Sequence, residues 1–173
     1  MGTVTEAWFR IESWVEKYAP KSLSALGPPA DPSAIHAGEA QLGLTFPPQS
    51  VESLRRHDGL TRWAMILPEA PPLGVSGIVE QHQDRMDIAE DVDGFASHAP
   101  GVEPWWHERW LPFGASDGGL QVIDRRAGPG HGRLGWAPHD NPGDFSEPWP
   151  TLCAYLTQVA DALGVRGEVH PSW

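Results

Sequence analysis

The 173-residue sequence predicts a single α+β domain that spans residues 1–173, with its core over about residues 5–164. Apolar residues at helical spacing dominate the first 95 positions, alternating apolar residues and turn-forming glycines follow from residue 110, and one more helical stretch ends near residue 164. Because the strands form one run instead of alternating with helices, this order is typical of an α+β fold. A chain of this length buries roughly 70% of its unfolded surface, which is enough for a core without disulfides.

The first helix is predicted over residues 3–18. Its apolar residues recur every three or four positions, and Thr3 with Glu6 has the spacing of a capping box. Pro20 lies just beyond the end, where a proline cannot continue the helix. A linker with one short helical turn is predicted to follow.

Two further helices are predicted before residue 60. Asp31 is a good N-cap for the second helix, and Gly43 is suited to end it. Phe46 then lies in an extended segment that leads into Pro47, where the third helix starts. The inner face of this third helix is predicted to contain Leu54.

The dipeptide His57-Asp58 at the end of the third helix has two interpretations. One large group of metal-dependent phosphohydrolases builds its active site around such a dipeptide, but that site needs further ligands from other helices, and the sequence has no H-x-x-x-H pair. The alternative is a helix end, because Gly59 suits a positive φ and a histidine is favourable in the last turn. We therefore expect a helix end here and no metal.

Residues 62–68 are predicted to form a strand that ends at Pro68, and residues 76–95 a helix with Ser76 as N-cap. One side of this helix is predicted to carry Ile78, His82, Arg85 and Ala89. Its far end is strongly acidic and carries Asp84, Asp87, Glu90, Asp91 and Asp93. A solvated helix face explains such a charge run, and a contact surface for a basic partner is the alternative reading.

The β structure is predicted after residue 110. Pro112 between two apolar residues indicates an irregular or edge strand. Asp117-Gly118-Gly119 has strong turn chemistry, and a strand over residues 120–125 follows it. A further strand is predicted over residues 133–137.

The last helix is predicted from Pro150 to Gly164, and the tail 165–173 is predicted to add a short strand. Cys153 falls within this helix, where a small buried thiol is expected. As the single cysteine, it excludes an internal disulfide and a cysteine-based zinc cluster.

The formal net charge of −11 argues against nucleic acid as a partner, because a phosphate backbone would be repelled. The same field attracts a basic protein, although it also serves simply to keep a domain soluble. The sequence shows no secretion signal and no long apolar run, so we expect a cytoplasmic protein that does not span a membrane.

Several short motifs occur in a characteristic order. They are Glu39-x-x-x-Gly43, Phe46-Pro47, "SLRRHDGL" at 53–60, "LP" at 67–68 and "WLPFGASDGGLQVID" at 110–124. In this order they resemble the SUKH superfamily, nearest to the Smi/Knr-like branch. The resemblance implies an α+β fold with a strongly curved, mainly antiparallel sheet and helices packed around it. It also implies protein binding without catalysis or a cofactor, since many bacterial members are immunity proteins that block a toxin.

The residues of these motifs are given structural roles. We expect Glu39 to accept hydrogen bonds from the following loop, Trp110 to lie in the core, and Asp124 to bond to a turn, to Arg125 or to Arg133. A functional role for Asp124 is the less favoured alternative. The glycines and prolines set helix ends at Gly43 and Gly59, a helix start at Pro47, limited strand pairing at Pro112, and a turn at Gly118 and Gly119.

The favoured function is a binding module that neutralises a basic toxin domain. Trp105 and Trp106 are the candidate anchors, of which at most one is expected to face the core, and Glu103 and Glu108 flank them. The charge candidates are Asp84, Asp87, Glu90 and Asp91.

Two alternatives are weighed against this function. A housekeeping scaffold or regulatory protein, like the fungal cell-wall assembly regulators, fits the same residues. An enzyme is disfavoured because no nucleophile–base pattern is found: Ser116 lacks the context of a nucleophile elbow. The sequence leaves the identity of the partner and the oligomeric state open.

Overall fold

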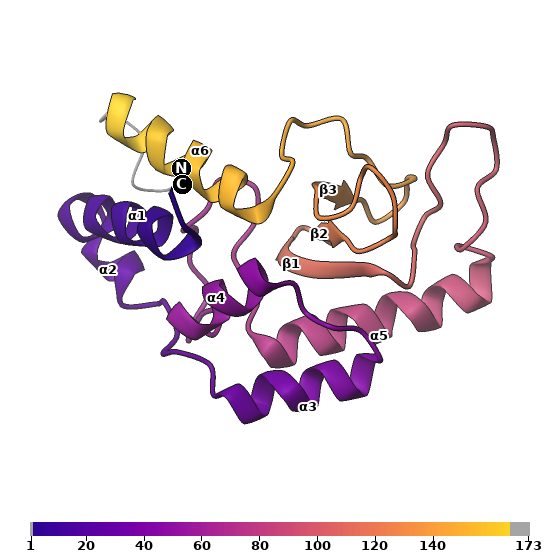
Figure 1. The fold of residues 1–173 in the computed structure, drawn as a ribbon, viewed down its shortest axis with the longest axis horizontal. Helices are drawn as coiled ribbons and strands as arrows, with labels where there is room; N and C mark the ends of the chain where they lie inside the picture. The colour runs from indigo at the N-terminus through magenta and orange to yellow at the C-terminus, as the bar shows by residue number, and fades with distance from the viewer. Residues whose placement is uncertain (1, 167–173) are drawn as a thin grey trace.

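The fold is built around a small antiparallel sheet of three strands in the order β1-β2-β3. The computed structural model describes residues 2–166, and α5 runs along one face of the sheet while α1, α4 and α6 gather beside one end of it (Figure 1). The helices and strands are α1 Val4–Tyr18, α2 Pro20–Leu23, α3 Pro32–Leu42, α4 Pro48–Arg56, α5 Val75–Val92, β1 Trp110–Ser116, β2 Gly119–Asp124, β3 Leu134–Ala137 and α6 Leu152–Arg166. The predicted α+β class is confirmed, whereas the strong curvature of the sheet stays a prediction.

Residues of β2 alternate between two hydrophobic clusters. Ile123 belongs to the larger cluster, which contains the inner faces of α1, α4 and α6 and the beginning of α5 at Val75 and Ile78. Leu120 and Val122 belong to the smaller cluster, together with Ala89 of α5 and Trp110. Since neighbouring side chains on a strand point to opposite faces, the sheet separates the two clusters. Trp110 is fully buried, as predicted.

The turn between β1 and β2 is a two-residue hairpin. Asp117 and Gly118 both have positive φ, at 49° and 80°, which is the signature of a type I′ turn, and Ser116 pairs with Gly119 across it. Gly119 has a different role from the one expected, because a Cβ there would lie 2.4 Å from the Trp136 ring. It makes room for an indole.

Pro112 lies in the edge strand β1, as predicted, next to a β-bulge between Pro112 and Gly114. The outer edge of β1 is covered by the segment before α5. Leu73 N donates to Phe113 O at 2.9 Å, and Ala115 N donates to Pro71 O at 3.2 Å. This segment takes the place of a fourth strand.

The predicted strand over residues 62–68 is wrong. The segment lacks regular strand pairing, and Ile66 and Leu67 are buried in the larger cluster instead. A strand requires a neighbour with free backbone groups, and the available edge of β1 is already occupied by residues 71–73. At the other end of the chain, α6 continues past Gly164 to Arg166, so the first two residues of the tail 165–173 are helical; the rest of this predicted strand lies outside the described residues.

Most of the predicted helix ends are confirmed. Thr3 and Glu6 form the capping box of α1, and Asp31 caps α3. Gly43 ends α3 in the left-handed conformation. Glu39 Oε2 accepts a hydrogen bond from Phe46 N at 2.7 Å, and Pro47 is the N-cap of α4, so both motif positions act as expected.

His57 and Asp58 connect three parts of the chain and serve as structural residues. The His57 ring lies 2.9 Å from Glu12 Oε2 of α1 through Nε2, and 2.9 Å from Gly27 O through Nδ1. Asp58 Oδ1 accepts a hydrogen bond from Val75 N at 2.8 Å and so satisfies the first turn of α5. The expectation that Ser76 caps α5 is wrong, because the N-cap residue is Gly74 and the side-chain acceptor for the first turn comes from Asp58.

Gly59 has the predicted positive φ of 65° but does not end α4, whose C-cap is His57. A Cβ at Gly59 would lie 2.3 Å from Gly74 N, so the glycine allows the chain after α4 to pass directly against the start of α5. The helix end and the close approach together place Asp58 under the α5 N-terminus.

Replacing Asp58 with alanine is expected to lower the free energy of unfolding by about 1–2 kcal/mol, because the first turn of α5 loses its acceptor. Asp58→Asn keeps a side-chain oxygen and should lose less. Urea denaturation followed by far-UV circular dichroism measures both values, and an alanine variant as stable as the wild type would contradict the capping role.

Candidate functional site

The exposed face of α5 is a continuous line of carboxylates. The buried side of the helix consists of Val75, Ile78, Val79, His82, Arg85 and Ala89, which confirms the side predicted from the sequence. Glu80, Asp84, Asp87 and Asp91 follow at steps of four, three and four residues, so they lie on the opposite side and all four are exposed. We call these four residues the acidic ridge; Glu90 is exposed beside it.

The acidic ridge has no basic neighbour on its own helix, since Arg85 is the single lysine or arginine of α5 and is buried. Within residues 2–166, none of the four carboxylates forms an ion pair. Like charges three and four residues apart destabilise a helix by about 0.2–0.5 kcal/mol per pair. The ridge is therefore a feature that folding alone does not favour.

Arg85 holds α5 against the sheet from below the ridge. Its guanidinium donates to Gly118 O at 2.9 Å and Ala137 O at 3.0 Å, which are carbonyls at the ends of the strands. The same group lies 4.7 Å from the ring centre of Trp105 and 5.5 Å from that of Trp106. Burial lowers the pKa of Arg85 to about 10, so the cation persists at neutral pH.

The two candidate anchors occupy different environments, and the prediction that at most one faces the core is confirmed. Trp106 is fully buried and packs edge-on against His82 and Trp110. It therefore offers no surface to a partner, and its inclusion among the contact residues was wrong, because burying its large ring in the smaller cluster is more favourable. Trp105 is half-buried, and its indole N–H donates to His139 O at 2.9 Å.

The two predicted flanking acids also differ. Glu103 is held by Arg126 at 2.8 Å and by Arg133 at 3.3 Å, so its charge is already neutralised within the chain. Glu108 is exposed, and its backbone oxygen lies 2.7 Å from His82 Nε2. Of the two, Glu108 is the one whose carboxylate is not engaged by an arginine among the described residues.

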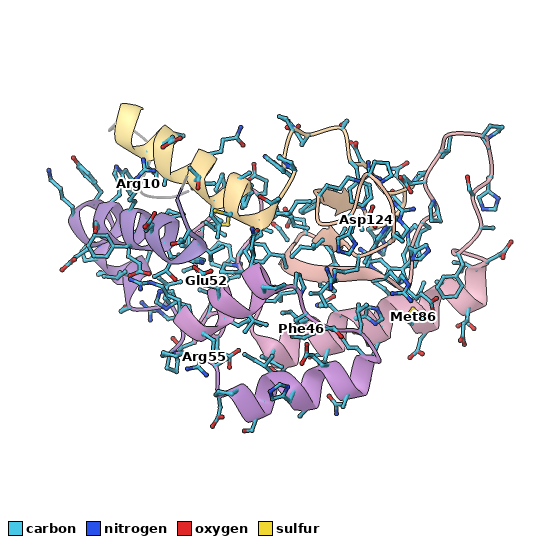
Figure 2. The ribbon with its side chains drawn as sticks, in the orientation of Figure 1. Arg10, Phe46, Glu52, Arg55, Met86 and Asp124 are labelled. Carbon is cyan, nitrogen blue, oxygen red and sulfur yellow. The ribbon has the colours of Figure 1, made fainter. Side chains whose placement is uncertain are left out.

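Asp124 lies in the sheet region of the molecule, at the end of β2 (Figure 2). It is 2% exposed and forms ion pairs with two arginines. Burial raises the pKa of its carboxyl, but the hydrogen bonds and charge of Arg126, with a further bond from Arg133, outweigh burial and hold that pKa below its usual value. Its partners are Arg126 at 2.9 Å and Arg133 at 3.2 Å, so Arg133 is confirmed while Arg126 takes the place expected of Arg125. The role of Asp124 is to join the end of β2 to the following loop.

A shallow hollow of about 410 Å³ lies at the N-terminal end of the ridge. Leu60, Pro71 and Leu73 form apolar parts of its wall, and Gly77 of α5 borders it. Trp63 stands at this hollow with 77% of its surface exposed, which is the largest exposed fraction of the large hydrophobic residues described. Sequence reasoning missed Trp63 because it assigned residues 62–68 to a strand. Every residue from Trp63 to Leu67 is apolar, so no alternation in the sequence marked Trp63 as the exposed one.

Exposed apolar residues also lie at the C-terminal end of α5. Ile88 is 44% exposed, Val92 61% and Phe95 39%. Ile88 and Val92 are four residues apart and lie beside the ridge on one edge of the helix. The surface thus combines carboxylates with apolar contacts at both ends, and we call the ridge, the Trp63 hollow and these three residues the α5 face.

Among residues 2–166, no group of three or more histidine, cysteine, aspartate or glutamate side chains is arranged to hold a metal ion. In the same part of the chain, no helix is both long and apolar enough to cross a membrane.

The fold and the α5 face define an α+β domain with a surface suited to protein recognition. The sequence profile of the SMI1 / KNR4 family (SUKH-1) matches residues 29–158, most of the 173-residue chain, and the chain belongs to this family. This confirms the resemblance seen in the sequence motifs and supports a protein-interaction module. No curated protein gives a significant match.

The stability of the fold is expected to fall at acid pH because of His82, a buried residue of α5. Burial lowers the pKa of His82, while the Glu108 carbonyl and charge oppose this effect only in part. The unfolded chain takes up a proton near pH 6.5, and the folded chain does so at lower pH. The stability that neutral His82 contributes is therefore present above about pH 6.5 and is lost as the pH falls below it. Urea denaturation measures the free energy of unfolding of the wild type and of His82→Gln at pH 7.5 and at pH 5.5. The advantage of the wild type over the variant in this free energy should be smaller at pH 5.5. An equal advantage at both pH values would contradict this role of His82.

Proposed function

We propose that this protein is a non-enzymatic immunity protein of the cytoplasm that binds and neutralises a basic toxin domain through the α5 face. The observation that carries the proposal is the acidic ridge, a line of exposed carboxylates that remains uncompensated within the described chain. Membership of the SMI1 / KNR4 family supports an interaction module. Asp84, Asp87, Glu90 and Asp91 are the proposed charged contacts, with Trp105 and Glu108 alongside.

The charged and the apolar residues of the α5 face are suited to different roles in binding. Carboxylates on an exposed helix steer a basic protein toward the surface and raise the association rate, mainly at low ionic strength. Affinity in protein interfaces comes mostly from a few large side chains that become desolvated. Trp63 at its hollow and the exposed Ile88 and Val92 are suited to this second role.

A second candidate function is a scaffold or regulatory protein that resembles the fungal cell-wall assembly regulators. The match to the SMI1 / KNR4 family profile supports this function as much as immunity. The α5 face also suits a basic partner of either kind. Co-expression with the product of the neighbouring reading frame separates the two functions. Restored growth of cells that make this product supports immunity, whereas binding without protection supports the scaffold.

The acidic ridge can be tested with matched double variants. Asp84→Asn with Asp91→Asn is expected to slow association with the neighbouring gene product several-fold at 50 mM salt and much less at 500 mM, because salt screens exposed charges. Glu16→Gln with Asp140→Asn removes the same charge from exposed sites elsewhere and should leave the rate nearly unchanged. Surface plasmon resonance measures both pairs, and equal slowing by the two pairs would show that net charge, not the ridge, steers the partner.

Trp63 can be tested separately from charge. Trp63→Ala is expected to weaken the complex about tenfold or more, chiefly through faster dissociation, because a large ring would no longer be buried by the partner. With 77% of the residue exposed, the free energy of unfolding should change by less than about 1 kcal/mol. Phe9→Ala, at a site 61% exposed on α1, is the control for loss of an exposed ring. Unchanged dissociation of the Trp63 variant would remove the hollow from the interface.

A further inference from the structure

A second acidic site lies on the opposite face of the sheet from α5. It is a cleft of about 370 Å³ lined by Glu69, Trp136, Asp144, Glu147 and Trp149. In β3, Ala137 belongs to the smaller cluster beside α5, so the preceding residue Trp136 points to the other face. The cleft is therefore separate from the α5 face.

The lining consists of two indoles and three carboxylates and includes no basic side chain. Among the described residues, Glu69, Asp144 and Glu147 are in no ion pair. Asp144 accepts a hydrogen bond from Ser146 N at 2.8 Å, which holds its carboxylate in a tight turn. Tyr155 donates to Glu69 Oε1 at 2.5 Å, which fixes the direction of that carboxylate. Two of the three acids are thus held in position by the chain.

A buried polar side chain lies next to this cleft. Gln121 of β2 is directly opposite Trp136 in the sheet, so the two side chains lie on the same face. Gln121 is 0% exposed and lies near Tyr155, yet neither its Nε2 nor its Oε1 makes a hydrogen bond of normal geometry. Buried amides without partners are rare in folded proteins and call for an explanation.

We propose that the cleft binds the guanidinium group of an arginine side chain presented by a partner protein. A guanidinium stacks on indole rings and donates paired hydrogen bonds to carboxylates, and both kinds of group line the cleft. The charge of the three carboxylates selects a cation over a neutral group of the same shape. An ammonium group forms neither the stacked contact nor the paired hydrogen bonds, so lysine binds more weakly. The site is independent of the α5 face, and its test needs no toxin.

The test uses the full-length ¹⁵N-labelled protein and follows the indole N–H resonances of Trp136 and Trp149. The probe is Nα-acetyl-arginine amide, with Nα-acetyl-citrulline amide as its uncharged isostere and Nα-acetyl-lysine amide as the second cation. We expect saturable shifts of both indole resonances with the arginine probe, weaker ones with lysine, and almost none with citrulline. Equal shifts with citrulline, stronger binding of lysine, or arginine-induced shifts confined to α5 would each overturn the proposal.

Two variants of cleft residues and one control variant test whether arginine binds in the cleft. Glu147→Gln alters an exposed residue of the cleft, and Trp136→Leu removes one ring; each is expected to weaken arginine binding about threefold to tenfold. Glu16→Gln removes the same charge from α1 and should not change the affinity. If Trp136→Leu fails to fold, Glu147→Gln decides the matter alone, since binding unchanged by that substitution overturns the proposal.

Discussion

The position of α5 depends on one buried cation. Arg85 lies between the helix and the sheet, where burial is costly, and it is stabilised by strand-end carbonyls and two indole rings rather than by a carboxylate. Because the guanidinium reaches carbonyls at both the β1–β2 turn and the end of β3, it fixes the rotation of α5 about its own axis. That rotation places the acidic ridge outward along its whole length.

The start of α5 is fixed by a second constraint, the close passage of the chain after α4. Gly59 and Gly74 approach so closely that a side chain at either position would clash with the facing backbone. This approach brings Asp58 to the first turn of α5, while His57 turns back to Glu12 of α1. A dipeptide that resembles a metal site thus connects α1, α4 and α5. The same backbone path forms one side of the hollow at Trp63.

The two faces of the sheet carry different kinds of acidic surface. On the α5 face the carboxylates form an exposed line, suited to long-range attraction of a basic protein. On the opposite face, three carboxylates surround two indoles in a cleft, which suits one cationic side chain at short range. The acidic ridge and the cleft together hold seven of the 23 aspartate and glutamate residues of the chain.

Local interactions were determined by the sequence itself, because each depends on residues a few positions apart. The capping box at Thr3, the left-handed end at Gly43 and the turn at Asp117-Gly118 were predicted on that basis, as was the inward side of α5. Tertiary structure decided what depends on partners distant in the chain. Residues 62–68 are not a strand because residues 71–73 occupy the β1 edge. Trp106 is fully buried inside the smaller cluster, whereas Trp105 packs against its border and stays half-buried. The Trp63 hollow and the cleft at Trp136 join segments far apart in sequence, so no local pattern of residues could reveal them.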